Sequence, residues 1–467
     1  MRPLPRKSML FIAILVISAL SCQTVTQFFE TQPTPVPLHE LENTPTTGSA
    51  MVTLTPFPTS TPAPDSTPTE ADSPVPPTPT LVPLSLEERQ ALFDEFWEIV
   101  NDEYLYADFN GQDWDAIGDE YRQQVTDLSI EDFYYALDEM IYLLGDDHSV
   151  YLSPQAAAAE DAEFAGNNDY VGIGIYHMPV PEAALTTVIL TFPGSPAENA
   201  GLKPHDNITA VDGRPLFNGD ENILDELRGP VGSVVTLTVQ TPGQDPRQVT
   251  IERQRIQSSV PVPWALLTSP SGQRIGYIMV TTFNDQTIPD EVEDALRAMT
   301  ADGPLDGLIV DNRLNGGGAD FILQDTLRYF TSGTVGHFVN RRQEVPLEVR
   351  ARDINGSQEV PLVVLVGKDT ISFGEVFAGI LQDRARAYLI GETTDGNVEI
   401  LYGYDFTDGS QLWIAHDTFR PAIDANADWE ETGIIPAEEI PVQWHEVTLS
   451  TDPAVNAAMD YFDTLTK

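Results

Sequence analysis

A serine at a predicted strand-to-helix junction is the first residue of this chain that could act as a nucleophile. Segment 363–396 reads VVLVGKDTISFGEVFAGILQDRARAYLIGETTDG, with apolar runs of strand length at Val363–Val366 and Ala387–Gly391. Apolar residues recur at helical spacing between these runs, and Ser372 stands where that helix would begin. A helix N-terminus offers free N–H groups and partial positive charge to a developing oxyanion. Serine is also a favoured N-cap, and this block alone favours that structural role over a catalytic one.

A glycine-rich turn after another predicted strand supplies the second half of a possible site. Residues 307–318 read GLIVDNRLNGGG. Three successive glycines let the backbone approach a substrate closely and present its N–H groups. We expect the N–H groups of Gly317 and Phe373 to form an oxyanion hole beside Ser372. Taken alone, such a turn is also a common way to end a strand.

Together these two blocks resemble the tail-specific, or C-terminal processing, serine protease family and its tricorn-core relatives. The family pattern is Asp-x-Arg-x-Asn-x-Gly-Gly, then Thr-x-Ser-x-x-Glu, then Gly-Glu-x-Thr. These motifs stand here as Asp311–Gly318, Thr370–Glu375 and Gly391–Thr394, and the resemblance extends over most of residues 86–441. It implies a serine peptidase that cleaves unfolded or C-terminally recognised proteins through an ester at Ser372. It implies no metal and no cofactor.

The usual base of the C-terminal processing branch is missing. The resemblance implies a lysine in the turn after Gly391–Thr394, and Asn397 occupies its place. No lysine lies between Lys368 and Lys467, so a shifted lysine does not replace it. A serine needs a base to be nucleophilic at neutral pH, and asparagine cannot serve as one.

The tricorn-like branch implies a different base. There, a histidine at the end of the N-terminal helical part acts with a glutamate that precedes a Gly-x-x-Pro segment, and the matching residues are His148 and Glu430. Ser372, His148 and Glu430 would then be nucleophile, general base and orienting carboxylate. Lysine-type members carry a structural histidine in the same turn, and Glu430 could equally be a surface acid. His416, on a predicted strand, is a second candidate base.

Loss of the lysine leaves a second function open. Relatives of this fold include a retinoid-binding protein of the eye that acts as a carrier. A catalytically inactive peptide-binding or scaffolding lipoprotein would keep the protease fold and lose the base. The two functions differ in whether Ser372 is activated.

The patterns along the chain divide it into segments. Residues 275–400 alternate predicted strands and helices, which favours an α/β core. We expect an α/β catalytic core with a β-rich tail, an inserted PDZ domain, a helical N-terminal subdomain and a disordered N-terminal tether. In chain order the segments are a signal peptide with a lipobox-like end (1–22), a Thr/Pro/Ser-rich linker (23–84), the helical subdomain (85–156), the PDZ domain (168–255), the catalytic domain (256–447) and a C-terminal helical tail (448–467).

The PDZ-like segment carries a possible peptide site. Tyr170–Ile175 resembles the carboxylate-binding loop of PDZ domains, in which successive N–H groups hold a peptide C-terminus. Asn222–Leu227 is expected to form the helix beside the groove. Proteins or peptides with free C-termini are therefore the expected partners. The residues expected to donate their N–H groups are Val171, Gly172, Ile173 and Gly174.

Charge excludes one class of partner. The chain has 467 residues, 72 of them acidic and 24 basic, and its formal net charge is −48. A surface of this sign repels nucleic acid, so no nucleic-acid partner is expected. The hydrophobic content of 41% is that of an ordinary globular protein.

The N-terminus indicates export. Basic residues precede the apolar run Met9–Leu20, as in a secretory signal peptide. Ser21-Cys22 then resembles the end of the lipobox of bacterial lipoproteins, although Ala19 departs from its preferred residues. We expect lipid attachment at Cys22, which would tether the exported protein to the outer side of the bacterial cytoplasmic membrane. Cleavage without lipid and an uncleaved anchor are the alternatives.

Metabolic labelling with a fatty acid tests this tether. Wild-type protein should take up the label and Cys22→Ser should not, because Cys22 is the only cysteine. Equal labelling of both proteins, or of neither, would contradict lipid attachment at this residue.

Overall fold

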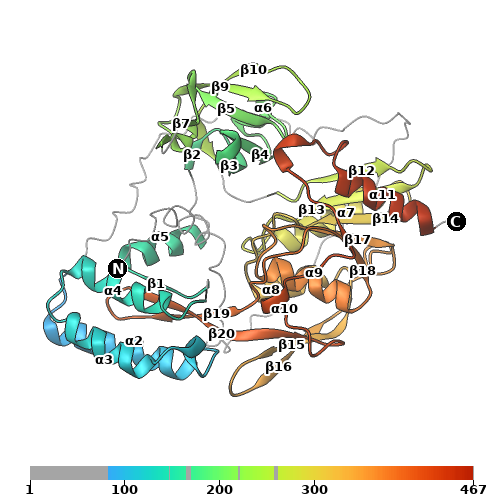
Figure 1. The fold of residues 1–467 in the computed structure, drawn as a ribbon. Helices are drawn as coiled ribbons and strands as arrows, with labels where there is room; N and C mark the ends of the chain where they lie inside the picture. The colour runs from blue at the N-terminus through green and yellow to red at the C-terminus, as the bar shows by residue number, and fades with distance from the viewer. Residues whose placement is uncertain (1–82, 147, 165–169, 219–220, 257–260, 466–467) are drawn as a thin grey trace, which may run out of the picture. The chain divides into compact units, whose positions relative to one another are not determined.

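The computed structural model describes residues 83–146, 148–164, 170–218, 221–256 and 261–465 (Figure 1). The predicted signal peptide with Cys22, and all but the last residues of the predicted linker, lie outside these ranges. Within them, no helix has the length and apolar character needed to cross a membrane.

A six-stranded sheet forms the centre of the catalytic domain. β12 is antiparallel to β13, and the remaining neighbours are parallel. Three helices, α7 (Ile288–Thr300), α8 (Asp320–Leu327) and α9 (Phe373–Asp383), lie in the connections between successive parallel strands (Figure 1). The strands in spatial order are β12 (Trp264–Thr268), β13 (Arg274–Met279), β14 (Gly307–Asp311), β17 (Leu362–Val366), β18 (Ala387–Gly391) and β21 (Glu438–Glu439).

The central strands are apolar on both faces because both faces are covered. On β14, Leu308 and Val310 pack in one buried cluster with the three connecting helices. Ile309 points the other way, into a second cluster with α11 (Pro453–Leu465). Near-continuous apolar runs of this kind are typical of parallel strands. The predicted α/β core is confirmed.

The N-terminal helices are joined to the catalytic domain through a strand. α2 (Leu86–Glu103), α3 (Trp114–Gln124) and α4 (Ile130–Tyr142) pack their buried side chains on the strands β19 and β20. After α4 the chain turns into β1 (Val150–Leu152), which pairs with β20, and then enters α5 (Pro154–Phe164). The five strands of this sheet are β1, β15 (Gly333–Val339), β16 (Glu344–Val349), β19 (Ile400–Asp405) and β20 (Gln411–Pro421).

The PDZ-like segment folds around its own sheet and its own buried cluster. Two short ribbons accompany this sheet, β2 (Tyr170–Gly172) with β11 (Gln254–Ile256) and β7 (Phe217–Asn218) with β8 (Glu221–Asn222). The short helix α6 (Pro196–Asn199) follows β4. The strands of the main sheet are β10 (Arg247–Glu252), β9 (Val234–Gln240), β5 (Asn207–Val211), β4 (Leu185–Thr191) and β3 (Ile175–Val180), with β6 (Arg214–Pro215) beside β5.

The helix expected over Asn222–Leu227 is wrong. Asn222 belongs to β8, and only the 3-10 turn Leu224–Leu227 follows. The Asn222 side chain accepts the N–H of Leu224 (3.1 Å), and such a local bond competes with helix formation.

A buried ionic cluster fixes the chain where β14 ends. Arg313 binds Asp311 (2.5 Å) and Asp452 (2.8 Å), and the Tyr277 hydroxyl donates to Asp311 (2.8 Å). Buried charges are tolerated only when they are paired and hydrogen-bonded. The cluster therefore sets the starting point of the glycine turn that follows.

Candidate active site

Ser372 has a backbone conformation that residues other than glycine rarely adopt. Its φ is 55° and its ψ is −127°, directly before α9. Three other serines that cap helices, Ser85, Ser129 and Ser195, have φ of −64°, −62° and −67°. Capping needs only the extended conformation that they show, so it does not explain the strain at Ser372. Strain of this kind is concentrated at functional sites, including nucleophiles on strand-to-helix turns.

Two asparagines hold the glycine turn against the serine turn. Asn312 Nδ2 donates to the carbonyl of Gly374 (2.8 Å), and Asn315 Nδ2 donates to Asn312 Oδ1 (2.9 Å). Gly317 lies so close that a Cβ added to it would be 2.7 Å from Ser372 Cβ. Only glycine fits at this position.

The two predicted oxyanion donors differ in their present partners. The N–H of Phe373 has no acceptor among the described residues. The N–H of Gly317 donates to Asn315 Oδ1 (3.0 Å), so the prediction for Gly317 does not fit this arrangement. The amides on either side of it, those of Gly316 and Gly318, have no acceptor within the described part of the chain, and Gly318 is the nearer of the two to Phe373 in sequence.

A buried glutamate ties the serine to the turn where the lysine is missing. The Glu375 carboxylate accepts the N–H groups of Ser372 (3.2 Å), Gly396 (2.9 Å) and Asn397 (2.8 Å) and the Thr394 hydroxyl (2.5 Å). Burial raises the pKa of Glu375, and these hydrogen bonds oppose that effect. The Asn397 Oδ1 is buried and has no donor among the described residues. The turn 394–397 is thus held by Glu375, and the Asn397 side chain within it cannot take up a proton.

His148 lies buried in the turn between α4 and β1. Its Nδ1 is 3.0 Å from Glu399 Oε2, at ion-pair distance but without the alignment of a good hydrogen bond, and its Nε2 has no partner in the described ranges. Asp146 fixes this turn by accepting the N–H groups of His148 (3.1 Å) and Ser149 (2.5 Å). One nitrogen against a carboxylate and the other unpartnered is the arrangement of a general base. No hydrogen bond joins His148 to Ser372 here.

Glu430 interacts with Glu399, and Glu399 in turn contacts His148. The Glu430 Oε2 accepts the N–H of Val398 (2.7 Å), and the Glu430 side chain is hydrogen-bonded to Glu399. Burial, followed by repulsion from Glu399, raises the pKa of Glu430 well above its usual range. Burial also acts to raise the pKa of Glu399, but contacts with His148, Tyr106 and Glu430 outweigh it and lower that pKa. Sequence reasoning named Glu430 and missed Glu399, whose only local signal is its place two residues after Asn397.

The other candidate bases are occupied. His416 has Nε2 at 3.2 Å from Glu103 and Nδ1 at 2.8 Å from Asp417, so neither nitrogen is available to Ser372. Lys368 is 69% exposed and faces Glu392 at 3.8 Å. Across the described ranges, His, Cys, Asp and Glu side chains do not gather in a group that could hold a metal ion.

The predicted carboxylate loop of the PDZ-like segment is partly filled from within. The Tyr170 hydroxyl interacts with the backbone N–H groups of Gly174 and Ile175; burial raises its pKa, and these N–H groups act to lower it. Its ring covers Gly172, where an added Cβ would lie 2.6 Å from the ring, and Arg228 lies 4.9 Å from the ring centre. Of the four predicted donors, Gly174 is therefore engaged by the protein itself.

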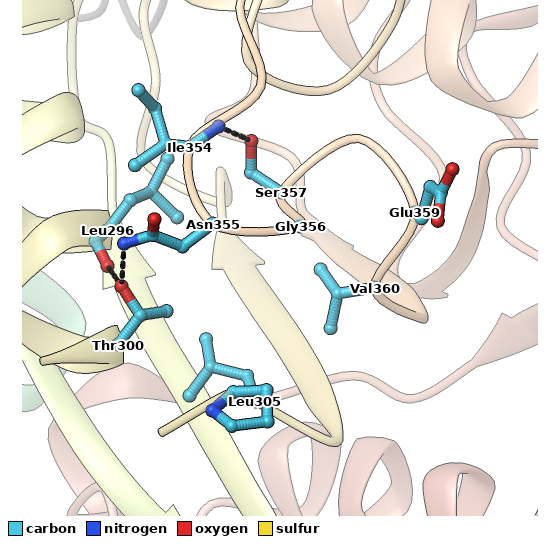
Figure 2. A pocket seen from close by; sticks show the side chains of 10 residues that line it. Leu296, Thr300, Leu305, Ile354, Asn355, Gly356, Ser357, Glu359 and Val360 are labelled. Carbon is cyan, nitrogen blue, oxygen red and sulfur yellow. Dashed lines mark hydrogen bonds between the residues drawn. The ribbon is translucent and has the colours of Figure 1, made fainter. Parts of the chain in front are cut away.

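A cavity of about 260 Å³ lies elsewhere, between α7 and the loop 354–360 (Figure 2). Asn355 Nδ2 donates to Thr300 Oγ1 (2.8 Å) in its wall. None of the site residues described above lines this cavity, so it is not where the serine would react. Its lining residues are Leu296, Thr300, Pro304, Leu305, Ile354, Asn355, Gly356, Ser357, Glu359 and Val360.

A parallel-sheet core that presents a strained serine beside a glycine turn, with a PDZ-like segment inserted before it, defines a class of serine peptidases. Family models agree with this assignment. Residues 274–440 match "Peptidase family S41", residues 85–142 match "Tricorn protease C1 domain" and residues 193–241 match "PDZ domain".

Individual relatives give the same result. The carboxyl-terminal-processing protease of Synechocystis is 32% identical over 386 residues, which cover 81% of this chain and 87% of that protein. CtpB of Bacillus subtilis is 26% identical, with 69% and 65% covered. A solved photosystem II D1 C-terminal processing protease is 26% identical and has a TM-score of 0.53, with 79% of this chain and 96% of that chain covered. This chain belongs to the C-terminal processing serine protease family, within peptidase family S41.

Replacing the strained serine by glycine should stabilise the fold. Strain at such a position costs about 1–3 kcal/mol, and glycine adds a backbone entropy cost of about 0.5–1 kcal/mol, so Ser372→Gly should raise the free energy of unfolding by about 1 kcal/mol. Urea unfolding measures this change. The matched control is Ser85→Gly, an ordinary extended cap, which should lower stability by a few tenths of a kcal/mol. A Ser372→Gly protein less stable than wild type would refute the strain.

Proposed function

We propose that this chain hydrolyses peptide bonds at Ser372 by acyl transfer, with His148 as the base in place of lysine. The observations that carry the proposal are a strained backbone at Ser372 and a buried His148 whose Nε2 has no partner among the described residues. The intact turn around Asn397 adds support, because the site keeps its architecture where the usual base is lost.

The proposed reaction has two acyl-transfer steps. His148 Nε2 takes the proton of Ser372 as its Oγ attacks the scissile carbonyl carbon, and then gives that proton to the leaving amine. The N–H groups of Phe373 and Gly318 face the negative oxygen of the tetrahedral intermediate. Water, deprotonated by the same imidazole, hydrolyses the ester and frees Ser372. Closure of the gap between His148 and Ser372 belongs to the substrate complex, since catalytic hydrogen bonds often tighten only there.

The proposed substrates are unfolded or C-terminally recognised proteins. Recognition of a free C-terminus would use the loop Val171–Gly174, with the partner strand adding main-chain hydrogen bonds. The names of the relatives, C-terminal processing proteases, support this class of substrate. We further propose that the protein is exported and held by lipid at Cys22 on the outer side of the bacterial cytoplasmic membrane. This last point rests on the sequence of residues 1–22.

Asn397 also favours a second function, a catalytically inactive peptide-binding lipoprotein. Such a protein would keep the fold and the PDZ loop, and its serine would not be activated. Reaction with a fluorophosphonate probe separates the two functions, because the probe labels only an activated serine.

Hydrolysis should depend on both the serine and the histidine. Wild-type protein should cleave unfolded protein substrates and react with the probe, and Ser372→Ala should abolish both. His148→Ala should lose up to about 10⁶-fold in kcat, as loss of the base does in a triad. Glu430→Gln should lose less.

His416→Ala is the matched control, because both of its nitrogens already face carboxylates. It should retain cleavage. Full activity of His148→Ala would refute the proposed base. A wild type that neither cleaves nor takes up the probe would support the inactive binder.

Peptide binding should depend on a free C-terminus. We expect the full chain carrying Ser372→Ala to bind a peptide with a free carboxylate more tightly than its amidated form. Tyr170→Phe should strengthen binding further, since it removes the hydroxyl that engages Gly174 and Ile175. Calorimetric titration measures both effects. Equal affinity for the two peptides would contradict this mode of recognition.

A further inference from the structure

The proposed base, His148, belongs to a cluster of three titratable side chains from separate parts of the chain. The other two are Glu399 and Glu430. We propose that Glu399 is the residue that positions His148. Glu430 lies on the far side of Glu399 and donates a hydrogen bond to the Glu399 carboxylate. This inference rests on the proposed role of His148 as the base. It replaces the pairing of His148 with Glu430 that the sequence suggested.

Direct contact favours Glu399. Its Oε2 is 3.0 Å from His148 Nδ1, and the two side chains are 3% and 2% exposed. Its other oxygen, Oε1, accepts the Tyr106 hydroxyl at 2.7 Å. Both oxygens therefore have separate partners, which fixes the orientation of the carboxylate and, with it, the imidazole.

Glu430 has other partners than His148. Its Oε2 accepts the N–H of Val398 (2.7 Å), and its interaction within the cluster is with Glu399. Glu399 is buried and Glu430 is partly buried, and two carboxylates in contact away from bulk water do not both carry a charge, so one of them holds a proton. Glu399 has the imidazole and a phenol to stabilise its charge, and Glu430 has a single backbone amide. The proton therefore resides on Glu430, and one negative charge faces His148.

The surrounding groups preserve this charge balance. Burial raises the pKa of Tyr104 and of Tyr106, so both phenols remain neutral donors. Tyr104 donates to Asp146 (2.7 Å), which also holds the histidine turn. The titratable groups that face the cluster from the neighbouring elements are Tyr104, Tyr106, Asp146 and Glu375.

This arrangement selects one tautomer of the histidine. With ionised Glu399 at Nδ1, the neutral imidazole carries its proton on Nδ1 and keeps its lone pair on Nε2, the atom without a partner. When Nε2 takes the serine proton, the resulting imidazolium lies against Glu399. The proton of Glu430 stays where it is throughout the reaction.

The tautomer of His148 can be measured by NMR spectroscopy, which does not require the protein to be catalytically active. We would label the full chain with 15N-histidine, assign the His148 signals by their loss in His148→Asn, and record both ring nitrogens above pH 7. Wild type should show the Nδ1–H form. Glu399→Gln should lose this preference. Glu430→Gln should keep it, because an amide N–H₂ can donate to Glu399 as the protonated carboxyl does.

Activity gives the second readout. Glu399→Gln should lower kcat by up to about 10⁴-fold, as loss of the orienting carboxylate does in a triad, with a smaller change in KM. Glu430→Gln and Tyr106→Phe should each cost less than about tenfold, the scale of one hydrogen bond. Glu399→Asp should recover part of the loss, because it restores the charge at a longer distance.

The outcomes separate this inference from the proposed function. A larger loss in Glu430→Gln than in Glu399→Gln, or an unchanged tautomer in Glu399→Gln, would overturn the role of Glu399. If Glu399→Gln fails to fold by circular dichroism, the same two measurements on Glu399→Asp decide. A wild type without hydrolysis would refute the proposed function alone, since the tautomer comparison still tests the positioning of His148.

Discussion

The buried carboxylate of Glu375 is the contact on which the rest of the site depends. It gathers four donors, three backbone amides and one hydroxyl, from the start of α9 and from the turn 394–397. Burying a carboxylate is costly unless it is hydrogen-bonded, so these donors are held together as a set. The same turn continues directly into Val398 and Glu399. One carboxylate therefore sets both the position of Ser372 and the direction in which the chain continues toward His148.

The role of Glu375 explains how the turn can form with asparagine in place of the usual lysine. Asn397 contributes its backbone N–H to Glu375, and any residue except proline could do so. The geometry of the turn thus does not depend on the side chain at this position. Asparagine at this position lacks the proton acceptor of a lysine and is compatible with the observed Ser372 turn, glycine turn and sheet. The histidine reaches the site on a separate element, the turn between α4 and β1, whose shape Asp146 controls.

Much of the fold could be predicted from the sequence because its signals are local. Apolar runs such as Val363–Val366 mark strands buried on both faces, and the capping box at Ser85 marks the start of α2. The nucleophile and its glycine turn are also continuous motifs. Contacts between distant segments left no such signal. Glu399 meets a histidine more than two hundred positions earlier, and apart from its place two residues after Asn397 nothing around it distinguishes it from the many other acids of this chain.

The same limit explains the smaller errors. The Gly317 amide donates to the Asn315 side chain, and in place of the expected groove helix the Asn222 side chain accepts the N–H of Leu224 at the start of a 3-10 turn. In both cases a short polar side chain bonds to nearby backbone. Such bonds depend on rotamers and turn geometry, which a pattern of apolar and polar residues does not specify.

The pairing of β1 with β20 has a consequence for timing. The turn that carries His148 is held by that pairing and by the bond from the Ala415 N–H to the Ser149 hydroxyl (2.9 Å). A chain emerging N-terminus first has made its histidine and its serine well before the strand that secures the histidine turn. Under the proposed mechanism, Ser372 lacks a fixed proton acceptor until residues 411–421 emerge and fold. The topology would then delay activity until nearly the whole chain is present and so protect its own unfinished segments from being cut.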